Sequence, residues 1–493
     1  MRTDLIQQFF SRLISIRLAG TAPLAILLCL GVILRWWNLG ERPLWLDEAR
    51  LYWIVQGDFA SIIVNNYLNN SAPPLFAFLL ALVTRISESE SALRIISFFA
   101  SVAAIPAIYA LARRFVTYPA ALFCAFLVTI APTQIQYAQQ VREYALTFLL
   151  AVLTFLLFDR YLETNTWRHL LLLMLIYWID VWTQYGLSLL IGGLALVLLT
   201  EIIYHRKAVL IPSGLLYAST LVMQIAVFFV SLRYQIRPGG FGASDYLAGG
   251  YWVDGSLVSL VKLAIVNSQD LLHFALFVPS LTLLLSSTGI LTALRQPRGR
   301  RAFLFFVVPL LLTWVFAVFR LYPYGGMRQD IFLTPMIYLF ASWGFDYVVS
   351  FDRQRILAIL LLVLCIIHPF VQTIRYHTTP PLEDIRPIVE RLRSDYHTGD
   401  TIYVYYGAEP AFRYYYRDHS EKWIIGIESR GDPKAYFRQL DSIVGAKNLW
   451  LVFSHCYNRE CEQIVEYMTR RYRVIERVIG DDVALYYVVL ENE

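Results

Sequence analysis

The chain has 493 residues, of which 57% are hydrophobic, 15% aromatic and only 16% charged. With a mean hydropathy of +0.52, it is too apolar for a soluble globular protein and too long for a single membrane span. The formal net charge of +5 is small for this length, so the composition gives no support to nucleic-acid binding. We therefore expect a polytopic membrane protein.

Apolar runs of about 20 residues predict the membrane spans. The first run follows three arginines and no small-residue cleavage site comes after it, so we interpret it as a retained span rather than a signal peptide. A further apolar run, 73–84, is too short to span and fits a juxtamembrane or re-entrant helix better. About eleven spans are predicted, near 18–39, 94–112, 119–136, 144–159, 168–183, 186–204, 208–232, 271–294, 302–320, 331–350 and 355–374.

Short basic connections fall on alternate ends of successive spans and predict the orientation. They lie near residues 113–114, 160–168, 206–207, 295–301 and 353–355. By the positive-inside rule these ends and the N-terminus are cytoplasmic. The outer face then receives the loop 40–93, the turn 137–143, the Gly-rich loop 233–270, the turn 321–330 and everything after residue 375. Counting 73–84 as a span would invert every later basic loop, so the charge pattern favours the shorter interpretation.

Residues 378–493 differ in kind from the preceding transmembrane domain, 1–377. Charged residues become frequent and apolar residues occur in short runs. Strand-like runs near 401–406, 423–427, 448–453, 472–475 and 483–489 alternate with helical patterns near 382–397, 432–444 and 459–471. This alternation predicts a small extracytoplasmic α/β domain, without a nucleotide-binding glycine motif. Its role is acceptor recognition or packing on the catalytic face, or else that of a plain structural cap.

The five cysteines fall into two groups. Three of them, Cys29, Cys124 and Cys365, lie within predicted spans and are interpreted as small core hydrophobes. Cys456 and Cys461 lie in the C-terminal domain, where an oxidising compartment would allow a short disulfide between them. With only His455 beside them they form a weak zinc signal. The sequence does not decide whether they are bridged.

Asp47 and Glu48 directly follow the first predicted span, where the chain leaves the membrane. Charge within or at a transmembrane segment costs roughly 2.5–3.5 kcal/mol per residue on insertion scales, so it is usually retained for a purpose. Two adjacent carboxylates at a bilayer surface are therefore candidates for catalysis. The alternative is an exposed pair of loop carboxylates.

Three arginines face outward in this topology, against the orientation bias: Arg94, Arg142 and Arg328. Each could be explained by snorkelling or by pairing with a nearby carboxylate. The functional explanation is anion capture, because a guanidinium offers a fixed fork of donors that matches a phosphate. Arg328 is the strongest candidate, since Gly325 and Gly326 free the backbone before it and a span begins immediately after it.

Together these motifs resemble those of integral-membrane glycosyltransferases of the GT-C type. Within that type the resemblance is to the group of the protein O-mannosyltransferases of family 39 and of bacterial lipid A and cell-wall sugar transferases. It covers about residues 18–375, and the α/β tail is a common addition. It rests on Asp47-Glu48, on the segments 71–76, 89–94 and 137–144, and on the stretch from Met327-Arg328 to Pro335.

The resemblance implies a donor sugar on a polyprenyl phosphate and transfer with inversion on the outer face. Asp47 would match the catalytic base that takes a proton from the acceptor hydroxyl, and burial can raise the pKa of such a carboxylate toward a useful value. Glu48 would orient Asp47 or contact the sugar. Arg328 and Arg142 would hold and neutralise the leaving phosphate.

Arg94, Glu143 and Tyr144 complete the predicted substrate and phosphate site. One departure from the group is Ala72, because many relatives have Lys or His just before the Pro-Pro pair. A donor-phosphate cation is then either absent or supplied by Arg94 or Arg328. Some relatives use a divalent metal, but no clear Asp/His cluster in this sequence demands one. We therefore predict no metal ligand and no certain cofactor, and a divalent metal stays open.

The sequence thus predicts a polyprenyl-phosphate-sugar-dependent glycosyltransferase of the plasma membrane, with its active site and C-terminal domain outside the cytoplasm. Its expected partners are the lipid-linked donor, membrane lipids and a glycan, lipid or protein acceptor, without nucleic acid. The alternatives are a protein O-mannosyltransferase and, from another class, a transporter or flippase. Transporters often show internal repeats and charges at the midplane, and neither is evident here. The sugar, the acceptor, the lipid length and the oligomeric state stay open.

Overall fold

The computed structural model describes residues 22–204, 210–236, 245–276, 279–350, 355–381, 383–417, 421–443 and 448–490. The chain divides into two compact units. Unit 1 comprises Met1–Trp37, Ile63–Leu79 and Arg94–Thr378. Unit 2 comprises Asn38–Ile62, Leu80–Leu93 and Thr379–Glu493.

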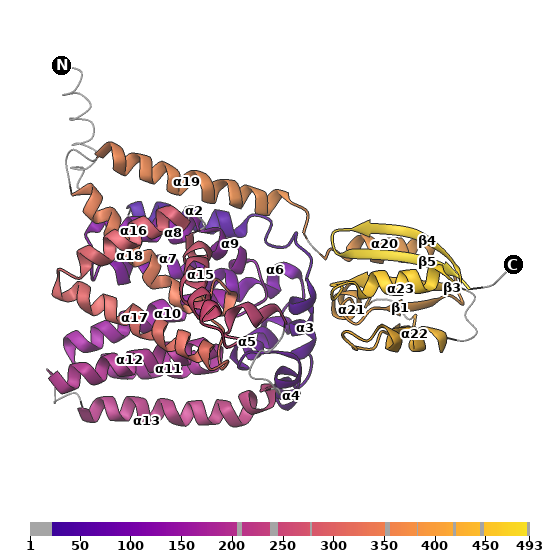
Figure 1. The fold of residues 1–493 in the computed structure, drawn as a ribbon, viewed down its shortest axis with the longest axis horizontal. Helices are drawn as coiled ribbons and strands as arrows, with labels where there is room; N and C mark the ends of the chain where they lie inside the picture. Colours follow the sequence, from indigo (N-terminus) through magenta and orange to yellow (C-terminus); the bar gives the residue numbers. More distant parts are fainter. Residues whose placement is uncertain are drawn as a thin grey trace, which may run out of the picture. The chain divides into compact units, whose positions relative to one another are not determined.

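Unit 1 is a bundle of apolar helices (Figure 1). Its longer helices are α2 (Ala22–Trp36), α7 (Ile95–Ala112), α8 (Tyr118–Ile130), α10 (Tyr144–Thr164), α11 (Trp167–Thr183), α12 (Tyr185–Tyr204), α13 (Leu210–Val227), α15 (Leu257–Leu276), α16 (Pro279–Ala293), α17 (Pro297–Val318), α18 (Thr334–Val349) and α19 (Arg355–Thr378). Shorter elements are α9 (Pro132–Ala138), η2 (Phe228–Leu232), α14 (Arg233–Gln235), η3 (Asp245–Gly250) and η4 (Arg328–Leu333). Two more helices, α4 (Phe59–Asn69) and α5 (Leu75–Thr84), each contain residues assigned to unit 1 and residues assigned to unit 2.

The length and composition of these helices suit a multi-pass membrane protein. Within the described residues, six helices are long and apolar enough to cross a membrane, or up to seven if the bent pair α8 and α9 counts as one span. Helices α2 and α5 are apolar but shorter. The ten-residue length of α5 agrees with the expectation that 73–84 is too short to span. A helix lies at each of the eleven predicted spans.

One predicted boundary is wrong. Residues 233–270 were expected to form a Gly-rich loop before a span at 271–294, but α15 already begins at Leu257 and ends at Leu276, and α16 begins at Pro279. The predicted span is therefore shared between two helices. Lys262 and Asp270 interrupt the apolar run in α15, so a search for uninterrupted apolar runs overlooks this helix.

Three of the predicted basic connections lie together at one end of unit 1. Arg114, after α7, contacts Asp159 and Glu163 of α10, at 2.6 Å in each case. Arg301 of α17 approaches Asp159 at 3.5 Å, and Arg298 approaches Glu163 at the same distance. The expectation that these connections share one face of the bundle is confirmed within unit 1.

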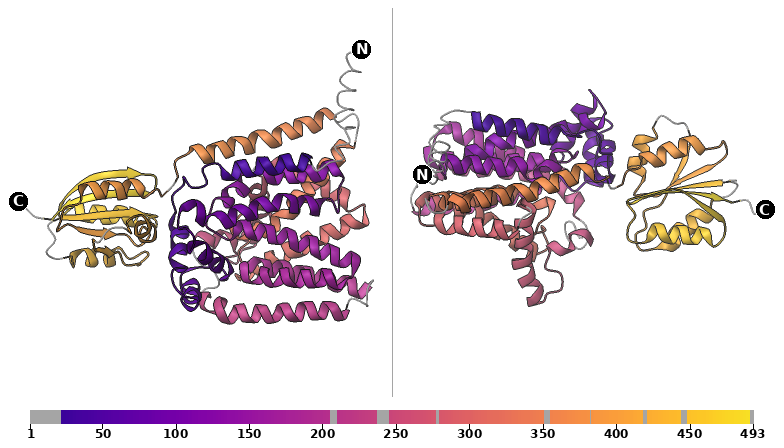
Figure 2. Two further views of the ribbon diagram at one scale, coloured as in Figure 1. Left: turned by 180° about the vertical axis from the view of Figure 1, so that it is seen from behind. Right: turned by 90° about the horizontal axis from the view of Figure 1, so that it is seen from above.

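The C-terminal part of unit 2 is a five-stranded sheet in the order β2-β1-β3-β5-β4. Its strands are β1 (Thr401–Val404), β2 (Trp423–Ile425), β3 (Asn448–Ser454), β4 (Arg473–Gly480) and β5 (Val483–Val489). Strand β1 is parallel to β2 and β3, whereas β5 is antiparallel to β3 and β4. Helices cover both faces of the sheet (Figure 2, right); they are α20 (Arg386–Asp395), α21 (Glu409–Tyr415), α22 (Pro433–Asp441) and α23 (Glu460–Thr469). The α/β alternation is confirmed, and α21 is the helix that the sequence pattern did not predict.

Two segments from the predicted loop 40–93 belong to the same unit as this sheet. They carry α3 (Leu46–Ile54) and α6 (Glu90–Leu93). The rings of Tyr52 and Tyr414 meet edge to face at 4.9 Å, and Arg417 pairs with Glu88 at 2.6 Å. These contacts join α3 to α21, and the residues just before α6 to those just after α21. The first candidate carboxylates therefore lie within the packing of unit 2.

Candidate functional site

Arg328 lies in a turn whose geometry depends on the residues around it. Gly325 has a φ of +150°, which side chains rarely allow. Its N–H donates to Oδ2 of the buried Asp330 at 2.8 Å. A Cβ at Gly326 would lie 2.3 Å from the backbone oxygen of Asp270. The two glycines therefore let the chain turn tightly against α15 and begin η4 with Arg328.

Arg142 and Arg328 meet at one tyrosine ring. The guanidinium carbon of Arg142 lies 5.6 Å from the centroid of Tyr144, and that of Arg328 lies 5.7 Å from it. Arg142 Nη2 also donates to the Tyr144 hydroxyl at 3.4 Å, and its Nε lies 3.4 Å from Glu143 Oε2. Arg142, Glu143 and Tyr144 are all buried. This cluster thus brings two guanidinium groups to one ring, with the carboxylate of Glu143 beside Arg142.

Arg94 belongs to the same region of unit 1. It precedes α7 and is 1% exposed. One turn further on, the Ser97 hydroxyl donates to the Arg142 carbonyl at 2.9 Å. The start of α7 is thus tied to the segment that carries Arg142, Glu143 and Tyr144.

A cavity of about 380 Å³ opens beside this cluster. It is lined by Arg328 and its neighbours, by α9 and by parts of α15 and η3; the lining residues are Thr133, Gln136, Tyr137, Leu247, Phe274, Gly326, Met327, Arg328 and Gln329. Among the described residues of this lining, Arg328 is the one charged side chain and the others are apolar or uncharged. An elongated apolar group with an anionic end fits such a lining, because the guanidinium offers the charge and the apolar residues of the wall can pack against the chain.

Asp47 and Glu48 lie in unit 2, in the first turn of α3. Carboxylates are favoured there because backbone N–H groups at a helix N-terminus carry partial positive charge. Asp47 is half-buried, whereas Glu48 is 1% exposed. The N–H of Leu46 donates to Oε2 of Glu383 at 3.2 Å. Glu383 therefore caps the helix that carries both candidate carboxylates.

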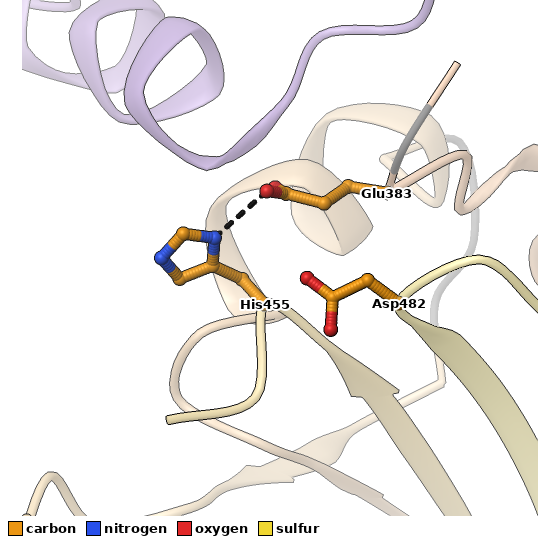
Figure 3. A group of neighbouring side chains, drawn as sticks. All are labelled: Glu383, His455 and Asp482. Atoms are coloured by element: carbon orange, nitrogen blue, oxygen red, sulfur yellow. Dashed lines mark hydrogen bonds and ion pairs between the residues drawn. The ribbon is translucent and has the colours of Figure 1, made fainter. Parts of the chain in front are cut away.

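A second group of titratable side chains lies beside α3. His455 Nδ1 is 2.8 Å from Glu383 Oε1 (Figure 3). This bond to Glu383 and the nearby carboxylates of Asp47 and Asp482 raise the pKa of His455 above its ordinary value. Burial and the charge of Glu383 raise the pKa of Asp482. Sequence analysis noted His455 only beside the two cysteines and did not name Glu383 or Asp482, because these residues are far apart in the chain.

The structure thus forms two groups of candidate residues. Arg94, Arg142, Glu143, Tyr144 and Arg328 belong to unit 1, and the first-turn carboxylates of α3 belong to unit 2. The prediction that the two groups share one cavity stays a prediction.

A buried arginine that sequence analysis overlooked has a different role. Arg35 in α2 is 0% exposed. It donates to the Ser101 hydroxyl at 2.7 Å and to the backbone oxygens of Val128 and Thr129 at 3.0 Å each. These bonds tie α2 to α7 and α8, so Arg35 is a packing element rather than an anion site.

Comparison with known proteins supports the fold. Residues 71–232 match the family model described as dolichyl-phosphate-mannose-protein mannosyltransferase. A search of curated proteins gives no match. ArnT from Cupriavidus metallidurans, in its crystal structure bound to undecaprenyl phosphate, is similar with a TM-score of 0.59 and 12% identity over 96% of this chain and 98% of that one.

The oligosaccharyltransferase of Archaeoglobus fulgidus is also similar. Its apo form gives a TM-score of 0.53 at 14% identity, over 87% of this chain and 69% of that one. The same protein, AglB, in complex with an inhibitory peptide and a dolichol-phosphate gives 0.52 at 14% identity. The chain therefore has the fold of GT-C glycosyltransferases, and the resemblance seen in its sequence is confirmed. Family match and fold together support a glycosyltransferase-type enzyme.

Proposed function

We propose that this protein transfers a sugar from a polyprenyl-phosphate-linked donor to an acceptor hydroxyl on the outer face of the plasma membrane, with inversion. The observation that carries the proposal is the pair of guanidinium groups, Arg142 and Arg328, on the ring of Tyr144 beside an apolar cavity. Undecaprenyl phosphate and dolichol-phosphate, the ligands named for ArnT and AglB, combine a single anionic end with an apolar chain. That combination matches the cavity.

In the proposed reaction Asp47 accepts the proton of the acceptor hydroxyl. The acceptor oxygen bonds to the anomeric carbon while the bond from that carbon to the phosphate oxygen breaks, and the electron pair leaves with the polyprenyl phosphate. Arg328 and Arg142 neutralise the leaving group, an effect that is strong where water is excluded. Glu48, buried next to Asp47, orients it or contacts the sugar.

Release of polyprenyl phosphate from a labelled lipid-linked sugar tests the phosphate site. Arg328→Ala should nearly abolish release, because no other cation lines the described part of the cavity. Arg328→Lys should be intermediate, because lysine keeps the charge and loses the bidentate fork. Removal of a preorganised charge of this kind typically costs about 10²–10³-fold in kcat.

Arg233→Ala is the matched control for this experiment. Arg233 also lies over aromatic rings, 5.3 Å from the centroid of Phe229 and 4.4 Å from that of Tyr234, but it is exposed and outside the cavity lining. Its replacement should leave release unchanged. Full activity of Arg328→Ala would reduce Arg328 to an interfacial anchor and move the phosphate site to Arg142 and Arg94.

Two alternative functions make different predictions in the same assay. The family description favours a protein O-mannosyltransferase, and labelled mannose would then appear on a serine or threonine hydroxyl of a peptide acceptor. A transporter or flippase would move the labelled donor across the bilayer without releasing polyprenyl phosphate.

A further inference from the structure

The structure changes which residues near Cys456 and Cys461 are candidate metal ligands. The two cysteines form a disulfide, so neither offers a thiolate to a metal. The neighbouring His455 instead meets Glu383 and Asp482, and one ligand atom from each lies within 4.8 Å of the other two. Figure 3 shows these three side chains pointing toward one another.

The register of the sheet brings two of the three together. Ser454, the last residue of β3, pairs with Val483, the first residue of β5. His455 and Asp482 are therefore the next residues outward on adjacent strands. Glu383 joins them because its N–H donates to the backbone oxygen of the residue before Asp482 at 3.1 Å. The cluster is thus fixed by backbone pairing at a strand end, where α/β domains commonly bind ligands.

The backbone conformation sets these residues apart. Glu383, His455 and Asp482 have φ values of +62°, +50° and +59°. Among the described residues only seven that are not glycine have a positive φ, and three of the seven form this cluster. Such conformations persist where the surrounding structure fixes them, often around ligands.

The cluster also carries an excess of negative charge. The charged groups that act on His455 are Glu383, Asp47 and Asp482, all carboxylates. Carboxylates gathered around one site repel each other, and a cation between them removes that repulsion. The side chain of Glu383 is 11% exposed and that of His455 is 43% exposed. An ion could therefore reach the cluster from the solvent on the histidine side.

We propose that Glu383, His455 and Asp482 bind a divalent transition-metal ion, with zinc as the preferred ion. One imidazole and two carboxylates suit zinc better than calcium or magnesium, which favour oxygen ligands alone. Ligand atoms about 2.1 Å from a tetrahedral zinc lie about 3.4 Å apart. His455 Nδ1 and Glu383 Oε1, now 2.8 Å apart, would move apart when the ion binds. A carboxylate oxygen of Asp482, now within 4.8 Å of both, would move closer to them. Rotation of the side chains allows both changes.

Binding at this site is coupled to α3. Glu383 uses its other oxygen, Oε2, to accept the N–H of Leu46, and Asp47 follows directly. An ion on Oε1 would fix the Glu383 side chain and, through it, the N-terminus of α3. The ion is then a positioning element for the candidate base, and its binding does not depend on which sugar is transferred.

Zinc binding is measured on the full-length protein, purified in detergent and stripped with a chelator, in competition with a chromophoric zinc indicator. One ion per chain is expected. Glu383→Gln, His455→Gln and Asp482→Asn should each weaken binding at least about 10- to 100-fold, the loss that even an indirect contact to a metal causes. Glu428→Gln, a 57% exposed carboxylate of the same domain, is the matched control and should bind normally.

Hydrogen exchange of the amides at 44–50 reports the coupling to α3. Zinc should slow exchange there in the wild-type protein and in Glu428→Gln, but not in Asp482→Asn. Absence of binding to the wild-type chain, or unchanged binding to a variant with all three replacements, would overturn the proposed site. Normal binding without any change at 44–50 would overturn its positioning role.

Discussion

The ring of Tyr144 joins two arginines that are far apart in the sequence. A guanidinium over an aromatic face is attracted by the quadrupole of the ring. Arg142 and Arg328 share this ring, whereas the donors of Arg35 bond to a hydroxyl and to backbone carbonyls. Arg328 also lines a cavity, whereas Arg35 ties α2 to α7 and α8; that placement separates a candidate anion site from a packing arginine.

Sequence reasoning selected Arg142 and Arg328 because their placement contradicts the charge bias of the topology. It did not select Arg35, since the sequence does not show which groups a charged residue inside a span contacts. The contact between Glu383 and His455 could not be predicted from the sequence either, because only the tertiary fold brings these residues, 72 positions apart, together.

Replacement of Asp47 by asparagine should remove most of the sugar transfer. The amide keeps the shape of the side chain but cannot accept the proton, and a general base typically contributes about 10²–10⁴-fold. Donor binding should persist, which equilibrium binding of the labelled lipid checks alongside turnover. Glu41→Gln, an exposed carboxylate in the same segment, serves as the control. Near-normal turnover of Asp47→Asn would move the role of the base to Glu48 or Glu143.

At the scale of elements, apolar runs predicted where the helices of unit 1 lie, and periodicity predicted the α/β alternation. The helix α15 was overlooked because Lys262 and Asp270 interrupt its apolar run. The helix α21 was overlooked for another reason. It has only seven residues, most of them aromatic or proline. The ring of Tyr414 packs against Tyr52 of α3, and that of Phe412 against Trp423 of β2. Tertiary contact, not local preference, stabilises such a helix.

Helices α16 and α18 pack through paired glycines, and this contact should be sensitive to added volume. A Cβ at Gly344 would lie 2.0 Å from the Leu285 oxygen, and one at Gly289 would lie 2.0 Å from the Phe340 oxygen. Gly344→Ala should therefore destabilise the bundle by about 1–3 kcal/mol, the usual cost of overpacking. A lower midpoint of thermal unfolding in detergent is the measurement.

Gly214 of α13 is the matched control, because a Cβ there meets nothing within 4 Å. Alanine at this position should be neutral or slightly stabilising, since glycine inside a helix costs about 0.5–1 kcal/mol relative to alanine. Equal midpoints for Gly344→Ala and Gly214→Ala would show that α16 and α18 separate easily.

At the scale of the whole molecule, the sequence predicted a change of character near residue 378 but not which outer segments pack with the C-terminal domain. Contacts such as the T-shaped pair of Tyr52 and Tyr414, or Arg413 over Trp53 at 3.9 Å, join residues several hundred positions apart. Composition carries no information on such pairs. The segment with Asp47 thus shares a compact unit with the C-terminal sheet, which is consistent with a role of that domain in positioning the candidate base.

The proposed reaction requires Asp47 to approach the phosphate held by Arg328 during turnover. We therefore expect cysteines introduced at Asp47 and at Met327, next to Arg328, to be joined by a short bismaleimide when Cys29, Cys124 and Cys365 are alanine. The pair of Asp47→Cys with Arg298→Cys is the control, because Arg298 lies with the basic connections near Glu163. Cross-linking is read as a mobility shift that persists after reduction, with a lipid-linked donor present and absent. A product from the control pair but not from the pair with Met327 would place the carboxylates with the opposite end of the bundle, and Asp47 could then not serve the phosphate at Arg328.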